Sequence, residues 1–192
     1  MPRSFVKRKI VLLGDASVGK TSLIRRFVLD RFSDEYIVTL GAKVTKKDLR
    51  FEFGPRVVDL SLLIWDVLGQ KGYKSLHEGA FFEAKGVLLV HDLTRPETRE
   101  SLENYWMDRV RAINGPIPGV IVGNKVDLVP SRTEAQEEVD AVARRFGTRG
   151  FLSSAKTGEN VQEAFMTLGR AVLEASGIVD EAARASATRP AR

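Results

Sequence analysis

The sequence predicts an α/β domain with a mostly parallel β-sheet. Apolar, β-branched segments of strand length alternate along the chain with longer segments that have helical spacing. The strand-like segments are apolar throughout, which is typical of strands that are covered on both faces. Strands that alternate with helices are joined by right-handed crossovers, so we expect a parallel sheet between two layers of helices.

Five of the predicted strands are apolar and a sixth is polar. We expect the polar strand at residues 42–53, where lysine and arginine are frequent. It belongs at the edge of the sheet, because charged edges discourage aggregation, and Gly54 and Pro55 join it to the next strand. The apolar strands are expected at residues 9–14, 57–66, 86–92, 119–125 and 150–155.

The longest helical pattern lies at residues 97–113. Leu102, Trp106, Val110 and Ile113 recur there at spacings of 4, 4 and 3, which places them on one face of a helix. Similar patterns predict further helices at residues 132–146 and 160–175.

The chain has 192 residues and no cysteine. We expect one domain over residues 1–177 and a flexible tail, rich in small residues, over residues 178–192. The lack of cysteine excludes disulfides, thiol catalysis, thiolate zinc sites and prenyl or palmitoyl anchors. Pro2 excludes N-myristoylation, and no apolar run reaches the ~20 residues of a membrane span. We therefore expect a soluble, cytoplasmic protein without a direct lipid anchor, which reaches membranes only through a partner.

The formal net charge is +5, and the excess of cations lies in the first half of the chain. A basic excess is compatible with nucleic acid, an acidic lipid surface or a phosphorylated ligand. A solvated basic face is the more common explanation, so we expect no nucleic-acid partner.

The first apolar strand runs into the sequence GDASVGKTS, which matches the pattern G-x-x-x-x-G-K-[ST]. Glycines let such a loop wrap tightly, so that successive N–H groups point at phosphate oxygens and the next helix adds its dipole. The lysine of the pattern bridges the β- and γ-phosphates, and its threonine ligates Mg²⁺. The pattern predicts a nucleoside triphosphate and Mg²⁺ but does not select the base. The predicted phosphate-binding residues are Gly14, Ala16, Ser17, Val18, Gly19, Lys20, Thr21 and Ser22.

Two later strand ends carry residues suited to guanine. The first ends in Asn124, Lys125 and Asp127, and a carboxylate can accept both hydrogen bonds that the guanine edge donates, a donor pair that adenine lacks. The next strand end supplies Ser154, Ala155 and Lys156, where a backbone N–H can donate to guanine O6 and a lysine stem can cover the ring.

Over residues 6–176 the chain resembles a small Ras-superfamily GTPase, nearest to the Rab and Ras branches. The resemblance rests on five motifs in order: GDASVGKT, Thr39 within EYIVTLG, WDVLGQ, NKVD and SAK. It implies a P-loop NTPase fold with a six-stranded sheet, whose second strand is antiparallel, flanked by about five helices. It also implies binding of GTP or GDP with Mg²⁺.

The resemblance assigns roles to the first mobile segment of the family, switch I. Phe32 falls where the family places an aromatic side chain against the guanine edge, although the pattern alone favours a core residue at a helix end. Tyr36 falls where a tyrosine closes over the phosphates. Thr39 falls where a threonine ligates Mg²⁺ and binds the γ-phosphate.

The second mobile segment, switch II, begins after Asp66, which can hold a water in the Mg²⁺ shell. Gly69 can bring its N–H to the γ-phosphate, and Gln70 can orient the attacking water. The family usually has Thr and then Ala or Pro where this chain has Val67 and Leu68. Either Leu68 docks on an apolar neighbour, biasing switch II or presenting a side chain to partners, or it is a tolerated variation.

The resemblance implies a guanine-nucleotide switch that hydrolyses GTP slowly. No arginine in switch I clearly offers a catalytic finger, and Ala16, where the family often has Gly, could crowd one supplied by a partner. Effectors are expected on switch I and switch II, together with an exchange factor and a GTPase-activating protein. A non-hydrolysing guanine-nucleotide scaffold with an altered switch II is the alternative, followed by a P-loop kinase or ATPase. Neither His77 nor His91 suggests a catalytic role.

Overall fold

The computed structural model describes residues 3–32 and 41–178, except the side chain of Lys74. It contains one six-stranded sheet in the order β2-β3-β1-β4-β5-β6. β2 pairs antiparallel with β3, and the other neighbouring strands are parallel. This confirms the predicted fold class, including the antiparallel second strand. The strands are β1 (Arg3–Leu13), β2 (Ala42–Phe53), β3 (Arg56–Val67), β4 (Gly86–Asp92), β5 (Gly119–Asn124) and β6 (Arg149–Ser153).

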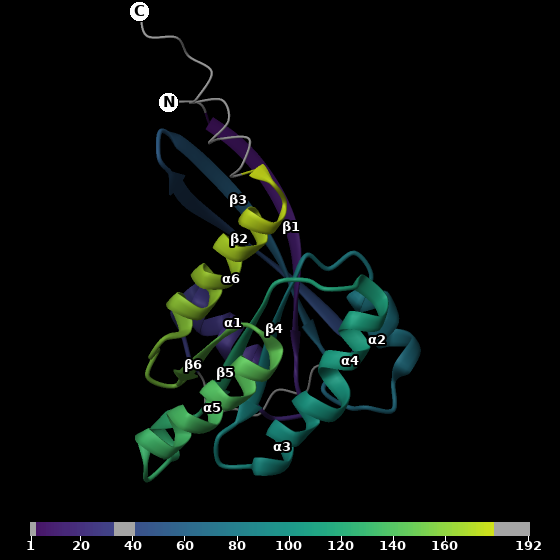
Figure 1. The fold of residues 1–192 in the computed structure, drawn as a ribbon, viewed down its shortest axis with the longest axis vertical. Helices are drawn as coiled ribbons and strands as arrows, with labels where there is room; N and C mark the ends of the chain where they lie inside the picture. The colour runs from purple at the N-terminus through teal and green to yellow at the C-terminus, as the bar shows by residue number, and fades with distance from the viewer. Residues whose placement is uncertain (1–2, 33–40, 179–192) are drawn as a thin grey trace, which may run out of the picture.

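Helices cover both faces of the sheet (Figure 1). On one face α1 and α6 share an apolar core, in which Phe27 and Phe165 stack with ring centroids 4.2 Å apart. On the other face α2, α5 and the helical segment between β4 and β5 form a second core around Trp106 and Phe81. The helices are α1 (Lys20–Leu29), α2 (Lys74–Phe81), α3 (Pro96–Ser101), η1 (Leu102–Trp106), α4 (Met107–Asn114), η2 (Val126–Leu128), α5 (Arg132–Phe146) and α6 (Val161–Ala175).

The first strand begins earlier than the sequence predicts. The apolar run starts at residue 9, but β1 starts at Arg3. From Arg3 to Lys9 the strand pairs with β3 only, because its pairing with β4 begins at Ile10. Phe5 is among the exposed large apolar residues. The apolar pattern did not predict this part of the strand, because it contains basic residues. A strand that extends beyond the covered part of a sheet need not be apolar.

The helix predicted at residues 97–113 contains a π-helical turn. α3, η1 and α4 follow one another without a break, and η1 is the π-helix. Leu102, Trp106 and Val110 are buried, as the spacing predicts. A π turn is usually a single local widening of an α-helix and is often found at functional sites.

No helix among residues 3–32 and 41–178 is long and apolar enough to cross a membrane. The predicted tail over residues 178–192 lies almost entirely outside the described residues, so its flexibility stays a prediction.

Candidate nucleotide site at the carboxyl ends of the strands

The phosphate loop connects the end of β1 to the start of α1 at the carboxyl edge of the sheet. Gly19 has a φ of 101°, and a Cβ added there would lie 2.2 Å from Asn124 Nδ2. A side chain is therefore excluded by both backbone conformation and space. The loop lies close against the end of β5, which brings the predicted phosphate and base residues together.

Lys20 is buried inside the phosphate loop. Its ammonium donates hydrogen bonds to the carbonyls of Gly14, at 2.7 Å, and Asp15, at 2.9 Å. Burial lowers the pKa of Lys20 to about 8, although Asp66 and Asp15 oppose the shift. A buried ammonium inside this loop suits a polyanion, because bound phosphate restores the solvation that burial removes.

The predicted metal residues meet where α1 begins and β3 ends. Thr21 Oγ1 donates to Asp66 Oδ2 at 2.5 Å, and the Asp66 side chain is buried. A hydroxyl beside a carboxylate provides the oxygen ligands that Mg²⁺ prefers, together with waters and substrate phosphates. The residues present therefore fit a magnesium ion. Direct ligation by Thr21 and a water-mediated contact of Asp66 stay predictions.

Asn124 joins the two loops on which guanine recognition is predicted to the phosphate loop. Its Nδ2 donates to the Val18 carbonyl at 2.8 Å, and its Oδ1 accepts from the Ala155 N–H at 3.2 Å. Ser154 Oγ donates to Asp127 Oδ1 at 2.5 Å, which fixes the exposed carboxylate predicted to read guanine. In the structure the Ala155 N–H is bound to Asn124, so its contact with guanine O6 stays a prediction.

Arg26 of α1 supports the loop that carries Ala155 and Lys156. Its guanidinium donates to the carbonyl of Ala155 at 2.9 Å and to that of Lys156 at 2.5 Å. The side chain of Lys156 is exposed beside the predicted base site. Sequence reasoning missed Arg26, because nothing in its helical pattern distinguishes it from other solvent-facing arginines.

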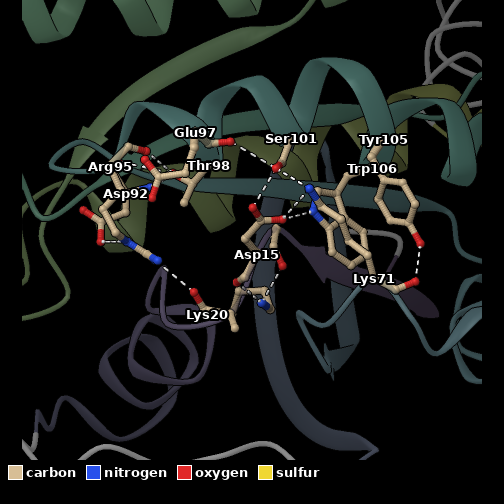
Figure 2. Close-up of polar contacts among 12 residues, drawn as sticks. Asp15, Lys20, Lys71, Asp92, Arg95, Glu97, Thr98, Ser101, Tyr105 and Trp106 are labelled. Atoms are coloured by element: carbon tan, nitrogen blue, oxygen red, sulfur yellow. Dashed lines mark hydrogen bonds and ion pairs between the residues drawn. The ribbon is translucent and has the colours of Figure 1, made fainter.

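Asp92, at the end of β4, connects the base lysine to the phosphate loop. It accepts from Arg95 Nε at 3.0 Å (Figure 2) and from Lys125 Nζ at 2.6 Å. Arg95 Nη2 donates in turn to the Ala16 carbonyl at 2.9 Å. Burial would raise the pKa of Asp92, but the bonds from Lys125, Thr94 and Arg95 lower it overall. Lys125 itself adopts a left-handed backbone conformation. The motifs did not single out Asp92 and Arg95, although a carboxylate at the end of a buried strand is a signal of a polar role.

The first residues of switch II are packed down. Val67 belongs to the second core, and Leu68 is 9% exposed, with its N–H on the Gly41 carbonyl at 3.1 Å. The Leu68 carbonyl lies 3.0 Å from His77 Nε2. These two hydrogen bonds involve the backbone of Leu68, and its side chain belongs to neither apolar core of the described residues. Docking of Leu68 on an apolar neighbour, and any bias of switch II, therefore stay predictions.

Gly69 and Gln70 differ sharply in their surroundings. A Cβ at Gly69 would lie 2.4 Å from the Asp15 carbonyl carbon and 2.5 Å from the Ala16 nitrogen, so switch II touches the phosphate loop there. Gln70 is exposed.

The structure leaves part of switch I unplaced. Phe32 is partly buried and packs against the first core, as the pattern alone favours, and its guanine contact stays a prediction. Tyr36 and Thr39 lie outside the described residues.

The fold and this site define the class of protein: a P-loop nucleotide-binding protein with a mostly parallel sheet. The Ras family model matches residues 9–174. Rab-13 of Mesocricetus auratus is 36% identical over 170 residues, which cover 88% of this chain and 81% of that relative. Rab-21 of Geodia cydonium is 33% identical over 171 residues, with 89% of this chain and 73% of the relative covered.

The chain therefore belongs to the Ras family and, within it, to the Rab branch of small GTPases. This confirms the resemblance drawn from the five motifs. It makes the chain a GTPase switch of the trafficking or signalling type, in a family whose members bind guanine nucleotides and Mg²⁺.

Proposed function

We propose that the chain alternates between GDP and GTP, each bound with Mg²⁺, and hydrolyses GTP slowly. The arrangement of Lys20, Thr21 and Asp66 carries the proposal, because it combines a buried cation with a paired hydroxyl and carboxylate. Asp127 and Ala155 stand on the neighbouring loops, where they would read the guanine edge.

Each residue of the site has one task in the proposed reaction. Lys20 binds the β- and γ-phosphates, and Thr21 and Asp66 hold the metal, which supplies charge neutralisation when it is bound. Gln70 orients a water for in-line attack on the γ-phosphate, and Gly69 offers its N–H to the same phosphate. Thr39 completes the metal site from switch I. Hydrolysis is slow because switch I offers no clear arginine, and a partner that supplied one would accelerate it by about 10³–10⁵.

Partner binding follows from the same switch. We assign effector binding to switch I, the basic edge strand β2 and switch II, whose order depends on the γ-phosphate. An exchange factor would set the rate of GDP release, and a GTPase-activating protein would set the rate of GTP hydrolysis. We assign the GTPase domain to residues 1–177, with residues 178–192 as a flexible tail. The protein would act in the cytoplasm.

Two measurements test this proposal. Competition of GDP, ATP and xanthosine diphosphate for the protein should show guanine preference, and Asp127→Asn should shift it toward xanthine. Single-turnover hydrolysis of bound GTP should be slow in the parent protein and slower in Gln70→Leu. Tight binding of ATP by the parent would reject guanine recognition, and equal rates for parent and Gln70→Leu would reject the role of Gln70.

A second candidate function is a guanine-nucleotide scaffold that does not hydrolyse GTP. The burial of Leu68 and the exposure of Gln70 favour it, because a switch II that kept its glutamine in solvent when GTP is bound would not position the attacking water. Absence of phosphate release from bound GTP over many hours, with intact guanine affinity, would favour the scaffold.

A further inference from the structure

Asp15, the second residue of the phosphate loop, is held between two side chains of the neighbouring helix. Trp106 Nε1 donates to its Oδ1 at 2.8 Å, and Ser101 Oγ donates to its Oδ2 at 2.6 Å. Figure 2 shows the carboxylate lying between these two donors. The Asp15 side chain is 19% exposed, so both bonds are largely shielded from water.

The π turn explains how both donors reach the same carboxylate. Ser101 and Trp106 are five residues apart, which in an α-helix separates them by about 140° around the axis. In a π turn the hydrogen bonds join residues five apart, which brings such residues toward the same side. η1 spans the residues between them, from Leu102 to Trp106. The irregular turn therefore serves the contact with the phosphate loop.

The same cluster also holds switch II at Lys71. Lys71 Nζ donates to Ser101 Oγ at 2.6 Å and lies 3.7 Å from Asp15 Oδ1. The Lys71 carbonyl accepts from Tyr105 Oη at 2.8 Å. Both the main chain and the side chain of Lys71 are thus attached to the helix that holds Asp15.

Gln70 lies between two anchored neighbours. On one side, Gly69 has no room for a Cβ because it touches the backbone of Asp15 and Ala16. On the other side, Lys71 forms an ion pair with Asp15 and hydrogen bonds with Ser101 and Tyr105. Fixing both flanking residues restricts the backbone of Gln70, although its side chain remains exposed.

The charges of the cluster also fit a site for polyphosphate. A carboxylate in the phosphate loop would repel a bound triphosphate, and a nearby ammonium offsets that repulsion. Lys71 provides this ammonium from switch II, so the pair joins the loop that binds phosphate to the segment that carries Gln70.

We propose that Asp15 is a positioning residue, which acts through Lys71 to hold Gln70 at the phosphate loop. This inference rests on the proposed role of Gln70 in hydrolysis. Asp15 and Lys71 touch neither the attacking water nor the γ-phosphate in this scheme. Their contribution is the placement of the residue between Gly69 and Lys71.

Three variants test the proposal, and an exposed lysine of β1 provides the control. Lys71→Met removes the ammonium and keeps the chain length, whereas Lys71→Arg restores a cation. Asp15→Asn keeps an oxygen that can accept from Trp106 and removes the charge. Lys7→Met is the matched control at a distant lysine. Amide hydrogen exchange of residues 68–72 is measured on each protein loaded with GDP and Mg²⁺, and the GDP affinity is measured by titration. Single-turnover hydrolysis is measured separately, on the same proteins loaded with GTP.

We expect exchange at residues 69–72 to rise about 10-fold in Lys71→Met and in Asp15→Asn, the size of a coupling between contacting residues. Hydrolysis should fall about 10-fold, while GDP affinity stays within about 3-fold. Lys71→Arg should recover most of both effects, and Lys7→Met should match the parent. A double variant that combines Asp15→Asn with Lys71→Met should be no worse than either single one.

Unchanged exchange, additive effects in the double variant or faster hydrolysis in either single variant would overturn the proposal. Faster hydrolysis would mean that the cluster restrains Gln70 rather than positions it. Failure of the proposed function looks different, since the parent protein would then release no phosphate. The exchange measurement still tests the Asp15–Lys71 contact in that case.

Discussion

The base side and the switch side of the nucleotide site are built in different ways. On the base side, buried side chains such as Asn124 and Asp92 connect loops from separate strands, each through two or more hydrogen bonds. On the switch side, Gln70 is exposed and Tyr73 is 53% exposed, and the contacts that hold the segment surround Leu68 and Lys71.

This difference separates binding from switching. Buried polar networks that are fully paired are rigid, because opening one bond exposes several groups to an environment that cannot solvate them. A segment held by a few contacts at its ends can detach at low cost, as conformational switching requires. Changes on the base side should therefore reduce affinity, and changes on the switch side should alter hydrolysis with little effect on affinity.

The largest expected effect tests the contact between the phosphate loop and the base side, at Gly19. Gly19→Ala would place a methyl group 2.2 Å from Asn124 Nδ2, in a backbone conformation that alanine rarely adopts. We expect GDP affinity to fall about 1000-fold, equivalent to about 4 kcal/mol, by isothermal titration. Gly147→Ala is the control, because its φ is also positive but a Cβ there meets nothing within 4 Å. If Gly147→Ala lost as much affinity, the loss in Gly19→Ala would be due to backbone strain or misfolding rather than to the contact with Asn124.

A glycine on the switch side should affect the other property. Gly69→Ala would place a methyl group 2.4 Å from the Asp15 backbone and push switch II away from the phosphate loop. We expect single-turnover hydrolysis to fall about 100-fold, as a displacement of about 1 Å can cause, with GDP affinity nearly unchanged. Gly72→Ala is the control, since a Cβ there meets nothing within 4 Å. If Gly69→Ala lost affinity as strongly as Gly19→Ala, the two sides would not be separable.

Much of the fold was predictable because burial leaves a clear pattern. β4 is buried along its whole length and reads as an apolar run, so its predicted range of 86–92 is the observed one. The first part of β1 was missed because it pairs on one side only and carries alternating exposed and half-buried residues. The π turn was also missed, since one extra residue within a helix changes the spacing of apolar residues very little.

The motif residues of the site were predictable, but their supports were not. Lys20 and Asn124 belong to short patterns with a chemical reason for each position. Asp15 lies at a position that the phosphate-loop pattern leaves free, and its partners Ser101 and Trp106 are more than 80 residues away. Contacts of this kind follow from how the elements pack, which one sequence does not display.

A third prediction concerns His91, a buried polar group of the base side that lacks a complete set of partners. Among the described residues, its Nε2 has no hydrogen-bond partner. Burial, with help from the charge of Arg99, lowers the pKa of His91 to about 4 from 6.5. The unfolded chain thus binds more protons than the folded one between these values, so stability should fall as the pH drops from 6.5 toward 4.

Replacing His91 by an aromatic residue should remove this loss. We expect the free energy of unfolding of the GDP-bound parent to decrease by about 2 kcal/mol more than that of His91→Phe between pH 7 and pH 5. Urea unfolding at both pH values measures this difference. His77→Phe is the comparison variant. Burial lowers the pKa of His77 as well, but the hydrogen bond to the Leu68 carbonyl, at 3.0 Å from Nε2, opposes that shift. Parallel pH dependence of the parent and His91→Phe would show that His91 does not titrate in this range.

The smallest expected effect concerns Arg95, which connects Asp92 to the phosphate loop. Arg95→Met removes the bond to the Ala16 carbonyl and one of the two cations on the buried Asp92 carboxylate. Lys125 remains on Asp92, so the carboxylate keeps a partner, and we expect GDP affinity to fall only about 10-fold. Arg99→Met, four residues further on in α3, removes a pair with Glu138 instead and should leave affinity unchanged. Affinity loss in Arg95→Met without any change in the hydrolysis of bound GTP would place Arg95 with the rigid side of the site. A change in hydrolysis alone would assign Arg95 to the switch side. The phosphate loop would then couple the two sides of the site.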